Sequence, residues 1–107
     1  MTTIYTWITD PAHGWLTVPL AELRDLGIAD DISKFSYIST SKGVASLEQD
    51  CDALRFIKAK GIDIRDREAL SRWCEENTFT RHHGNANHQC YPHPVRNCDQ
   101  YSVSAAA

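Results

Sequence analysis

The stretch that decides the fold is TTIYTWITDPAHGWLTV, residues 2–18. Its first half, residues 2–9, is dense in β-branched and aromatic side chains, with Ile4 and Ile8 on one face of an alternating pattern. A proline and a glycine then turn the chain, and residues 15–18 resume with strand-forming side chains. This stretch therefore predicts two neighbouring strands at the start of an antiparallel sheet.

The next part of the chain alternates between helical and strand periodicity. Pro19 stands where a proline opens a helix, and leucines follow at helical spacing up to Gly27, which can end that helix. Residues 35–39 and 44–47 are typical of the two strands of a hairpin, and residues 40–43 supply its tight turn.

Two more helices are expected after the hairpin. Asp50 is placed to cap a helix that runs to residue 59 and is closed by Gly61. A last helix is expected from residue 66 to residue 76. Cys51 and Cys74 fall in these helical segments, where a free thiol usually behaves as a small buried hydrophobe.

The order strand, strand, helix, hairpin, helix, helix predicts an α+β fold. We expect a small antiparallel sheet of three to four strands, covered on one face by two to three helices. The 107 residues suffice for one core, which we place in a compact body over residues 1–76. From residue 77 to residue 107 the periodicity stops, which predicts an irregular tail with His and Cys residues, either part of the same domain or partly mobile.

Composition excludes several classes of function. A hydrophobic fraction of 42% with 23% charged residues is ordinary for a folded soluble protein. The net charge of −3 leaves no surplus for a broad basic face, so we do not expect direct nucleic-acid binding. The sequence shows no membrane-spanning run and no secretory signal, so we expect a cytoplasmic protein with reduced cysteines and no membrane partner.

The tail concentrates metal-ligand chemistry. Residues 82–98 hold four of the five histidines and two of the four cysteines. Imidazole and thiolate are good zinc ligands, and His88, Cys90, His93 and Cys98 could close around a tetrahedral ion. The spacing matches no specific zinc module and contains no Cys-x-x-Cys knuckle. We favour an exposed polar loop with no cofactor, and keep a structural or hydrolytic zinc site as the alternative.

A histidine and a tryptophan form a second candidate site, His13-Gly14-Trp15. His13 beside Asp50 or Asp52 could act as a general base. More often such a histidine makes one structural hydrogen bond while the tryptophan packs. The sequence contains no glycine-rich phosphate loop, nucleophile elbow or His-Glu-x-x-His motif, so we expect binding rather than catalysis and assign no catalytic residues.

Three carboxylates, Glu48, Asp50 and Asp52, lie at a predicted strand-to-helix junction. Negative side chains there meet the positive end of the helix dipole, so capping is the favoured interpretation. An acidic face offered to a basic partner is the second. A calcium loop would need more oxygen ligands and a turn glycine.

Two blocks of the chain carry a resemblance. The first is HGWLTVP at residues 13–19 with LGI at residues 26–28, and the second is SY at residues 36–37 followed by LEQDCDA at residues 47–53. Together they resemble a family of small proteins of bacteriophages, prophages and plasmids, which shows His-Gly-Trp-Leu and Tyr-Leu-Glu-Glu-Asp-Cys-Asp-Ala blocks. The resemblance covers roughly the first 60 residues. This chain departs from it at Ser46, where the family has tyrosine, and at Gln49, where it has glutamate.

The resemblance implies a mobile genetic element expressed in a bacterial cytoplasm. Small acidic proteins in that setting often bind and block host machinery, including defence complexes, as anti-CRISPR proteins do. We therefore expect an accessory protein that binds a host protein or complex, and we leave homo-oligomerisation open. Because a few aromatic anchors rimmed by charge can dominate an interface, the expected contact residues are Trp15, Tyr37, Glu48, Asp50 and Asp52.

Overall fold

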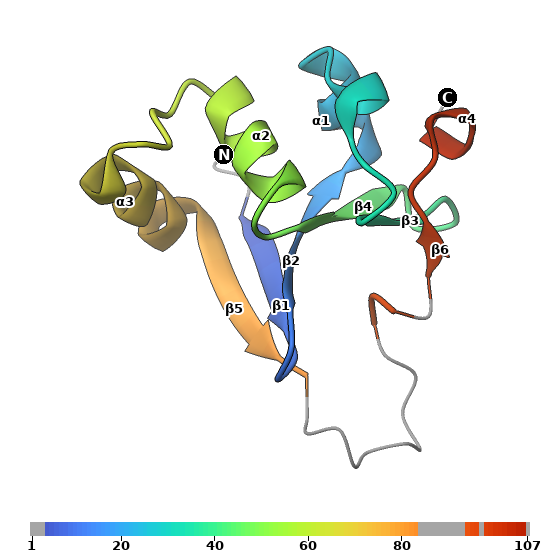
Figure 1. Ribbon diagram of the computed structural model, residues 1–107, viewed down its shortest axis with the longest axis horizontal. Helices are drawn as coiled ribbons and strands as arrows, with labels where there is room; N and C mark the ends of the chain where they lie inside the picture. The colour runs from blue at the N-terminus through green and yellow to red at the C-terminus, as the bar shows by residue number, and fades with distance from the viewer. Residues whose placement is uncertain (1–3, 84–93, 97, 107) are drawn as a thin grey trace.

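The computed structural model describes residues 4–83, 94–96 and 98–106. Within these residues the fold is α+β, as predicted, with one six-stranded sheet and four α-helices (Figure 1). In chain order the elements are β1 (Tyr5–Thr9), β2 (Gly14–Pro19), α1 (Leu20–Asp25), a 3-10 turn (Ala29–Asp31), β3 (Tyr37–Ser39), β4 (Val44–Glu48), α2 (Asp52–Ala59), α3 (Arg67–Asn77), β5 (Thr78–His82), β6 (Asp99–Gln100) and α4 (Val103–Ala106). No helix in the described ranges is long and apolar enough to cross a membrane.

The sheet is larger than predicted and is mixed rather than antiparallel. Its strand order is β5-β1-β2-β4-β3-β6. The β1–β2 and β3–β4 pairs are antiparallel, as the predicted turns between them require. The β2–β4 and β3–β6 pairs are also antiparallel, whereas β5 pairs with β1 in parallel. The expectation of three to four antiparallel strands is therefore wrong in number and in orientation.

The two unpredicted strands come from the part of the chain expected to be irregular. Strand β5 lies at the edge of the sheet and is mostly exposed, with Phe79 at 48% exposure. An edge strand without a buried face has no reason to alternate apolar and polar side chains, so its sequence lacks the period-two signal. Strand β6 has only two residues and carries no pattern at all.

The three helices expected from the sequence are confirmed, with local corrections, and α4 is a further helix in the part of the chain expected to be irregular. Gly27 and Gly61 follow α1 and α2 at φ 73° and 94°, a left-handed conformation that glycine adopts at little cost. Asp50 does not cap α2, because the residue preceding that helix is Cys51, whose side chain makes no capping hydrogen bond. Cys51 is exposed rather than buried, whereas Cys74 is half-buried and burial raises the pKa of its thiol.

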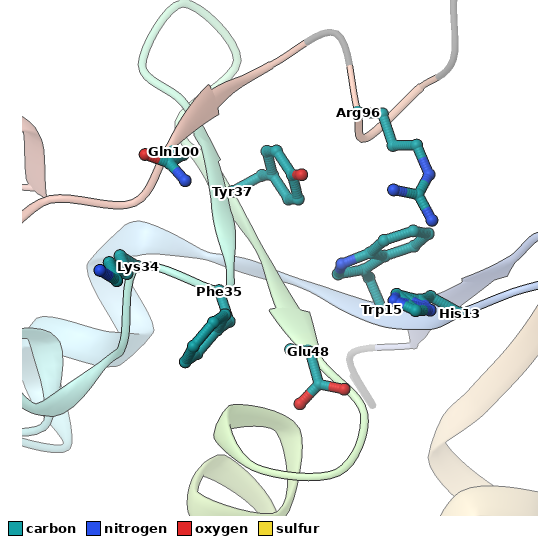
Figure 2. Close-up of a pocket in the computed structure, with 8 residues that line it drawn as sticks. All are labelled: His13, Trp15, Lys34, Phe35, Tyr37, Glu48, Arg96 and Gln100. Atoms are coloured by element: carbon teal, nitrogen blue, oxygen red, sulfur yellow. The ribbon is translucent and has the colours of Figure 1, made fainter.

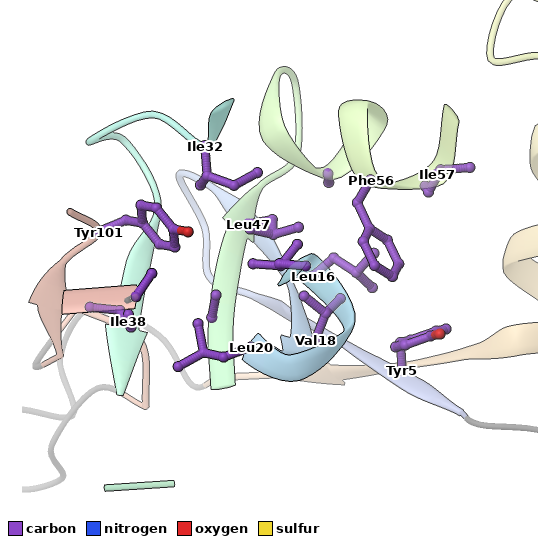
Figure 3. Packing of buried hydrophobic residues seen from close by; sticks show 14 of the residues in the cluster. Tyr5, Leu16, Val18, Leu20, Ile32, Ile38, Leu47, Phe56, Ile57 and Tyr101 are labelled. Atoms are coloured by element: carbon purple, nitrogen blue, oxygen red, sulfur yellow. The ribbon is translucent and has the colours of Figure 1, made fainter. Parts of the chain in front are cut away.

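All four helices pack against one apolar cluster on the same face of the sheet. Figure 3 shows Phe56 of α2 directed toward Leu16 and Val18 of β2, with Tyr101 at the opposite end of the cluster. Because successive strand residues point to opposite faces, alternate positions of the strands enter this core. Its buried members are Tyr5, Leu16, Val18, Leu20, Leu23, Ile32, Ile38, Ala45, Leu47, Ala53, Phe56, Ile57, Trp73, Tyr101 and Ala106.

Strand β1 enters the core through Tyr5, whereas Ile4 is 50% exposed. The Tyr5 ring stacks on Trp73, and its hydroxyl donates to the Glu22 carboxylate at 2.6 Å. Burial, followed by the neighbouring Glu22, raises the pKa of Tyr5. Lys60 pairs with the same carboxylate at 3.1 Å, so this polar cluster joins β1, α1 and the end of α2.

Candidate partner-binding site

The strand register brings Trp15, Tyr37 and Glu48 together on the face of the sheet away from the helices. Trp15 lies directly opposite Glu48 in the β2–β4 pair. Tyr37 of β3 lies opposite Ser46, which is two residues before Glu48 and therefore on the same face. Leu16 and Leu47, the neighbours of Trp15 and Glu48 in sequence, point the other way into the core.

These three side chains line one hollow with a volume of about 240 Å³ (Figure 2). We call it the Trp15 hollow. Its lining side chains come from four strands and from the segments beside them, namely His13, Trp15, Lys34, Phe35, Tyr37, Glu48, Arg96 and Gln100.

Trp15 forms a covered wall of the hollow rather than an exposed anchor, since it is only 1% exposed. Tyr37 packs edge-on against its ring, at 6.1 Å between centroids and 79° between planes. His13 lies 5.9 Å away on the same measure, and the guanidinium carbon of Arg96 lies 5.0 Å from the ring centroid. Trp15 thus holds the surrounding side chains in place through aromatic and cation–π contacts.

An ion pair fixes Arg96 beside Trp15. Its Nε donates to Asp10 Oδ2 at 2.9 Å, and the other oxygen of Asp10 accepts from the backbone N–H groups of Ala12 and His13 at 2.9 and 2.7 Å. Burial alone would raise the pKa of Asp10, but the Arg96 hydrogen bond and the two backbone donors outweigh it and hold this pKa well below its ordinary value. Next to Arg96, Val95 is fully buried, which anchors the segment to the body.

Phe35 stands at the rim of the hollow with 66% of its surface exposed. Its backbone N–H donates to Ser33 Oγ at 3.2 Å, so the loop that presents it is tied down. Phe35 was not among the contact residues expected from the sequence, and it lies in a turn before β3 rather than in the strand expected over residues 35–39. No sequence signal points to Arg96, because the chain brings it to Trp15 from a distant segment.

The three predicted carboxylates have different surroundings. Glu48 lines the hollow, and its Oε2 accepts from the backbone N–H of Asp50 at 3.1 Å. Asp50 is exposed beside it. Asp52 is fully buried and accepts from the hydroxyls of Ser33 and Ser36, each at 2.6 Å, and from the Ser33 N–H at 3.1 Å. Asp52 therefore lies outside any contact surface, and it instead holds the loop that carries Phe35.

The geometry around His13 does not support a general base. Its Nδ1 lies 2.6 Å from the carbonyl oxygen of Ala12. Asp50 and Asp52 both belong to the described residues, and neither is hydrogen-bonded to His13 there. His13 instead packs on Trp15, so the structure favours the structural role that the sequence analysis gave as the more common one.

The predicted zinc ligands fall mostly outside the described residues, which include Cys98 but not His88, Cys90 or His93. Cys98 is half-buried, and its Sγ donates to the carbonyl oxygen of Pro94 at 3.4 Å. Among the residues that the structure describes, no group of three or more His, Cys, Asp or Glu side chains is arranged to hold a metal ion. The zinc site stays a prediction.

The chain was compared with protein families, curated proteins and solved structures. No protein-family model, no curated protein and no solved structure matches the chain.

Proposed function

We propose that this protein acts by binding another protein through the Trp15 hollow and its rim. The observation that carries the proposal is the 66% exposure of Phe35 beside a hollow that Tyr37 and Glu48 also line. A large apolar side chain at the edge of a concave surface of mixed polarity is typical of a binding interface. Of the five contact residues expected from the sequence, Tyr37 and Glu48 line this hollow, and Trp15 forms its covered wall.

The walls of the hollow are held in position from behind. Asp52 fixes the Ser33–Ser36 loop through its three hydrogen bonds, and Trp15 is enclosed by Tyr37, His13 and Arg96. A surface whose side chains are already ordered loses less conformational entropy when a partner binds. This rigidity supports binding to a folded surface of a partner.

The resemblance to phage, prophage and plasmid proteins supports a setting for this binding. We propose that the partner is a bacterial host protein or complex in the cytoplasm, and that binding inhibits it, as an anti-CRISPR-like factor inhibits a defence complex. The net charge of −3 and the exposed Asp50 next to the hollow favour a basic surface on the partner.

The test begins with capture of the partner from a bacterial lysate, followed by binding measurements with the purified partner. We expect Phe35→Ala to raise the Kd about tenfold or more, because the change removes an apolar anchor of the interface. Phe79→Ala is the matched control, since Phe79 is also an exposed phenylalanine, on the distant edge strand β5. Equal Kd values for the Phe35→Ala variant and the wild type would rule out this surface.

A further inference from the structure

The side chains around the Trp15 hollow indicate which chemical group of a partner it would receive. Phe35 and Tyr37 provide aromatic rings, and Glu48 provides a carboxylate. Figure 2 shows Glu48 between Phe35 and Trp15 at the margin of the hollow. Aromatic faces and a carboxylate together form the usual protein site for an organic cation, because the ring quadrupole and the negative charge attract the same group.

The Glu48 carboxylate has capacity for such a group. One of its oxygens accepts the Asp50 N–H at 3.1 Å. An ionised carboxylate offers roughly four lone-pair sites and can receive a two-pronged guanidinium. Glu48 is half-buried, and a partial loss of water strengthens an ion pair formed there.

The two basic side chains of the hollow do not cancel this preference. Arg96 is paired with Asp10 at 2.9 Å, so its charge is balanced within the chain. Its guanidinium carbon lies 5.0 Å from the Trp15 ring centroid, so Arg96 already covers that ring, and a partner's side chain would lie against Phe35 and Tyr37 instead. Lys34 lies on the side of Phe35 away from Trp15 in Figure 2.

We propose that the Trp15 hollow binds one arginine or lysine side chain of the protein partner. This inference rests on the proposed function and names the group that the partner contributes. The volume of the hollow, about 240 Å³, is sufficient for a single long side chain. The apolar stem packs on Phe35 and Tyr37, while the charged end pairs with Glu48.

The test uses small probes on the isolated full-length protein, so it needs no partner. N-acetyl-arginine amide is titrated while backbone amide shifts are followed by NMR, beside the neutral isostere N-acetyl-citrulline amide and the anionic N-acetyl-glutamate amide. We expect saturable shifts around Phe35, Tyr37 and Glu48 with a millimolar Kd for the arginine probe, and binding at least about fivefold weaker for the other two.

Two variants test whether the Glu48 carboxylate is responsible for binding of the arginine probe. Glu48→Gln should weaken binding of the arginine probe at least about fivefold, whereas Glu75→Gln, an exposed glutamate on α3, should leave it unchanged. Equal binding of the citrulline probe, preference for the glutamate probe, or an unaltered Kd in Glu48→Gln would overturn the proposal. If the probe fails while Phe35→Ala still weakens the partner complex, then the partner's chemistry is wrong and the surface stands. If both fail, then the site itself is wrong.

Discussion

At the scale of single residues, Asp52 is a buried carboxylate that holds the loop carrying Phe35. Glu48, Asp50 and Asp52 look equivalent as three carboxylates at a junction, yet one lines a hollow, one is exposed and one is fully buried. Strand alternation separates Glu48 from its apolar neighbour Leu47, but nothing local marks Asp52 as the acceptor for two serines. The serine donors come from the loop before β3, 19 and 16 residues away in the sequence, so these hydrogen bonds form only when the chain folds. Arg55, three residues along α2, also donates to the carboxylate at 3.5 Å.

Replacing Asp52 by asparagine tests this role. The amide keeps the size of the carboxylate but loses its charge and part of its capacity to accept from Ser33 and Ser36. We expect Asp52→Asn to lower the free energy of unfolding by about 1.5–3 kcal/mol, the range for charge-assisted hydrogen bonds. Urea denaturation measures it. The control Asp50→Asn, at an exposed position, should stay within about 0.5 kcal/mol, and equal losses in both variants would contradict the buried role.

At the scale of elements, the sequence predicts the parts that bury one face and misses those that do not. The β3–β4 hairpin and α2 followed from periodicity and from glycines with left-handed φ. Periodicity did not predict strand β5, because this strand joins β1 through backbone hydrogen bonds and buries no apolar face of its own. Periodicity therefore predicts the helices and strands that bury one apolar face, and it does not predict the edge strands β5 and β6.

The contact between the β1–β2 turn and the segment 94–96 depends on the Asp10–Arg96 pair and should be sensitive to acid. The pKa of Asp10 is lower in the folded protein than its ordinary value of 3.8. The ionised carboxylate therefore stabilises the fold above about pH 4, and this stabilisation is lost as the pH falls through the lower, folded pKa. We expect Asp10→Asn to have a lower Tm than the wild type at pH 7 and a smaller loss of Tm from pH 5 to pH 2.

Thermal unfolding followed by circular dichroism at several pH values measures this difference. Asp63→Asn provides the control, because Asp63 belongs to an exposed pair with Arg65 at 3.8 Å and should contribute little. A difference in Tm between the wild type and Asp10→Asn that stays constant from pH 7 to pH 2 would contradict the ion pair's role.

At the scale of the whole molecule, both faces of the sheet carry structure that should unfold together. Trp73 packs in the core on the helical side, and Trp15 packs on the opposite face. Because the same strands support both, we expect one transition in urea, with tryptophan fluorescence and far-UV circular dichroism giving the same midpoint. Trp15→Phe leaves Trp7 and Trp73, which both pack at the core, as the fluorescent reporters, whereas Trp73→Phe keeps Trp15 together with Trp7. Within each variant the fluorescence and circular dichroism midpoints should still coincide. Separate midpoints would show that the two faces of the sheet do not unfold together.

The candidate site was predictable only in part, for a reason that also belongs to the whole molecule. Tyr37 and Glu48 come from the two strands of a predicted hairpin, so their proximity was within reach of the sequence. Trp15 meets Glu48 through the β2–β4 pairing, which joins strands separated by α1 and β3 and was not predicted. Arg96 and Gln100 arrive from the far end of the chain through β6 and the 94–96 segment. Contacts of such long sequence separation leave no trace in local periodicity.

The position of β1 between β2 and β5 affects how the chain can pair its strands during translation. Its neighbour β2 emerges at once, but β5, its other neighbour, begins only at Thr78. At about 5–20 residues per second, translation leaves one side of β1 without its neighbour for several seconds. During that interval the nascent chain offers an open row of amides and carbonyls to any other extended polypeptide. A stalled or truncated translation product ending before Thr78 would keep that row open permanently and would be prone to aggregate.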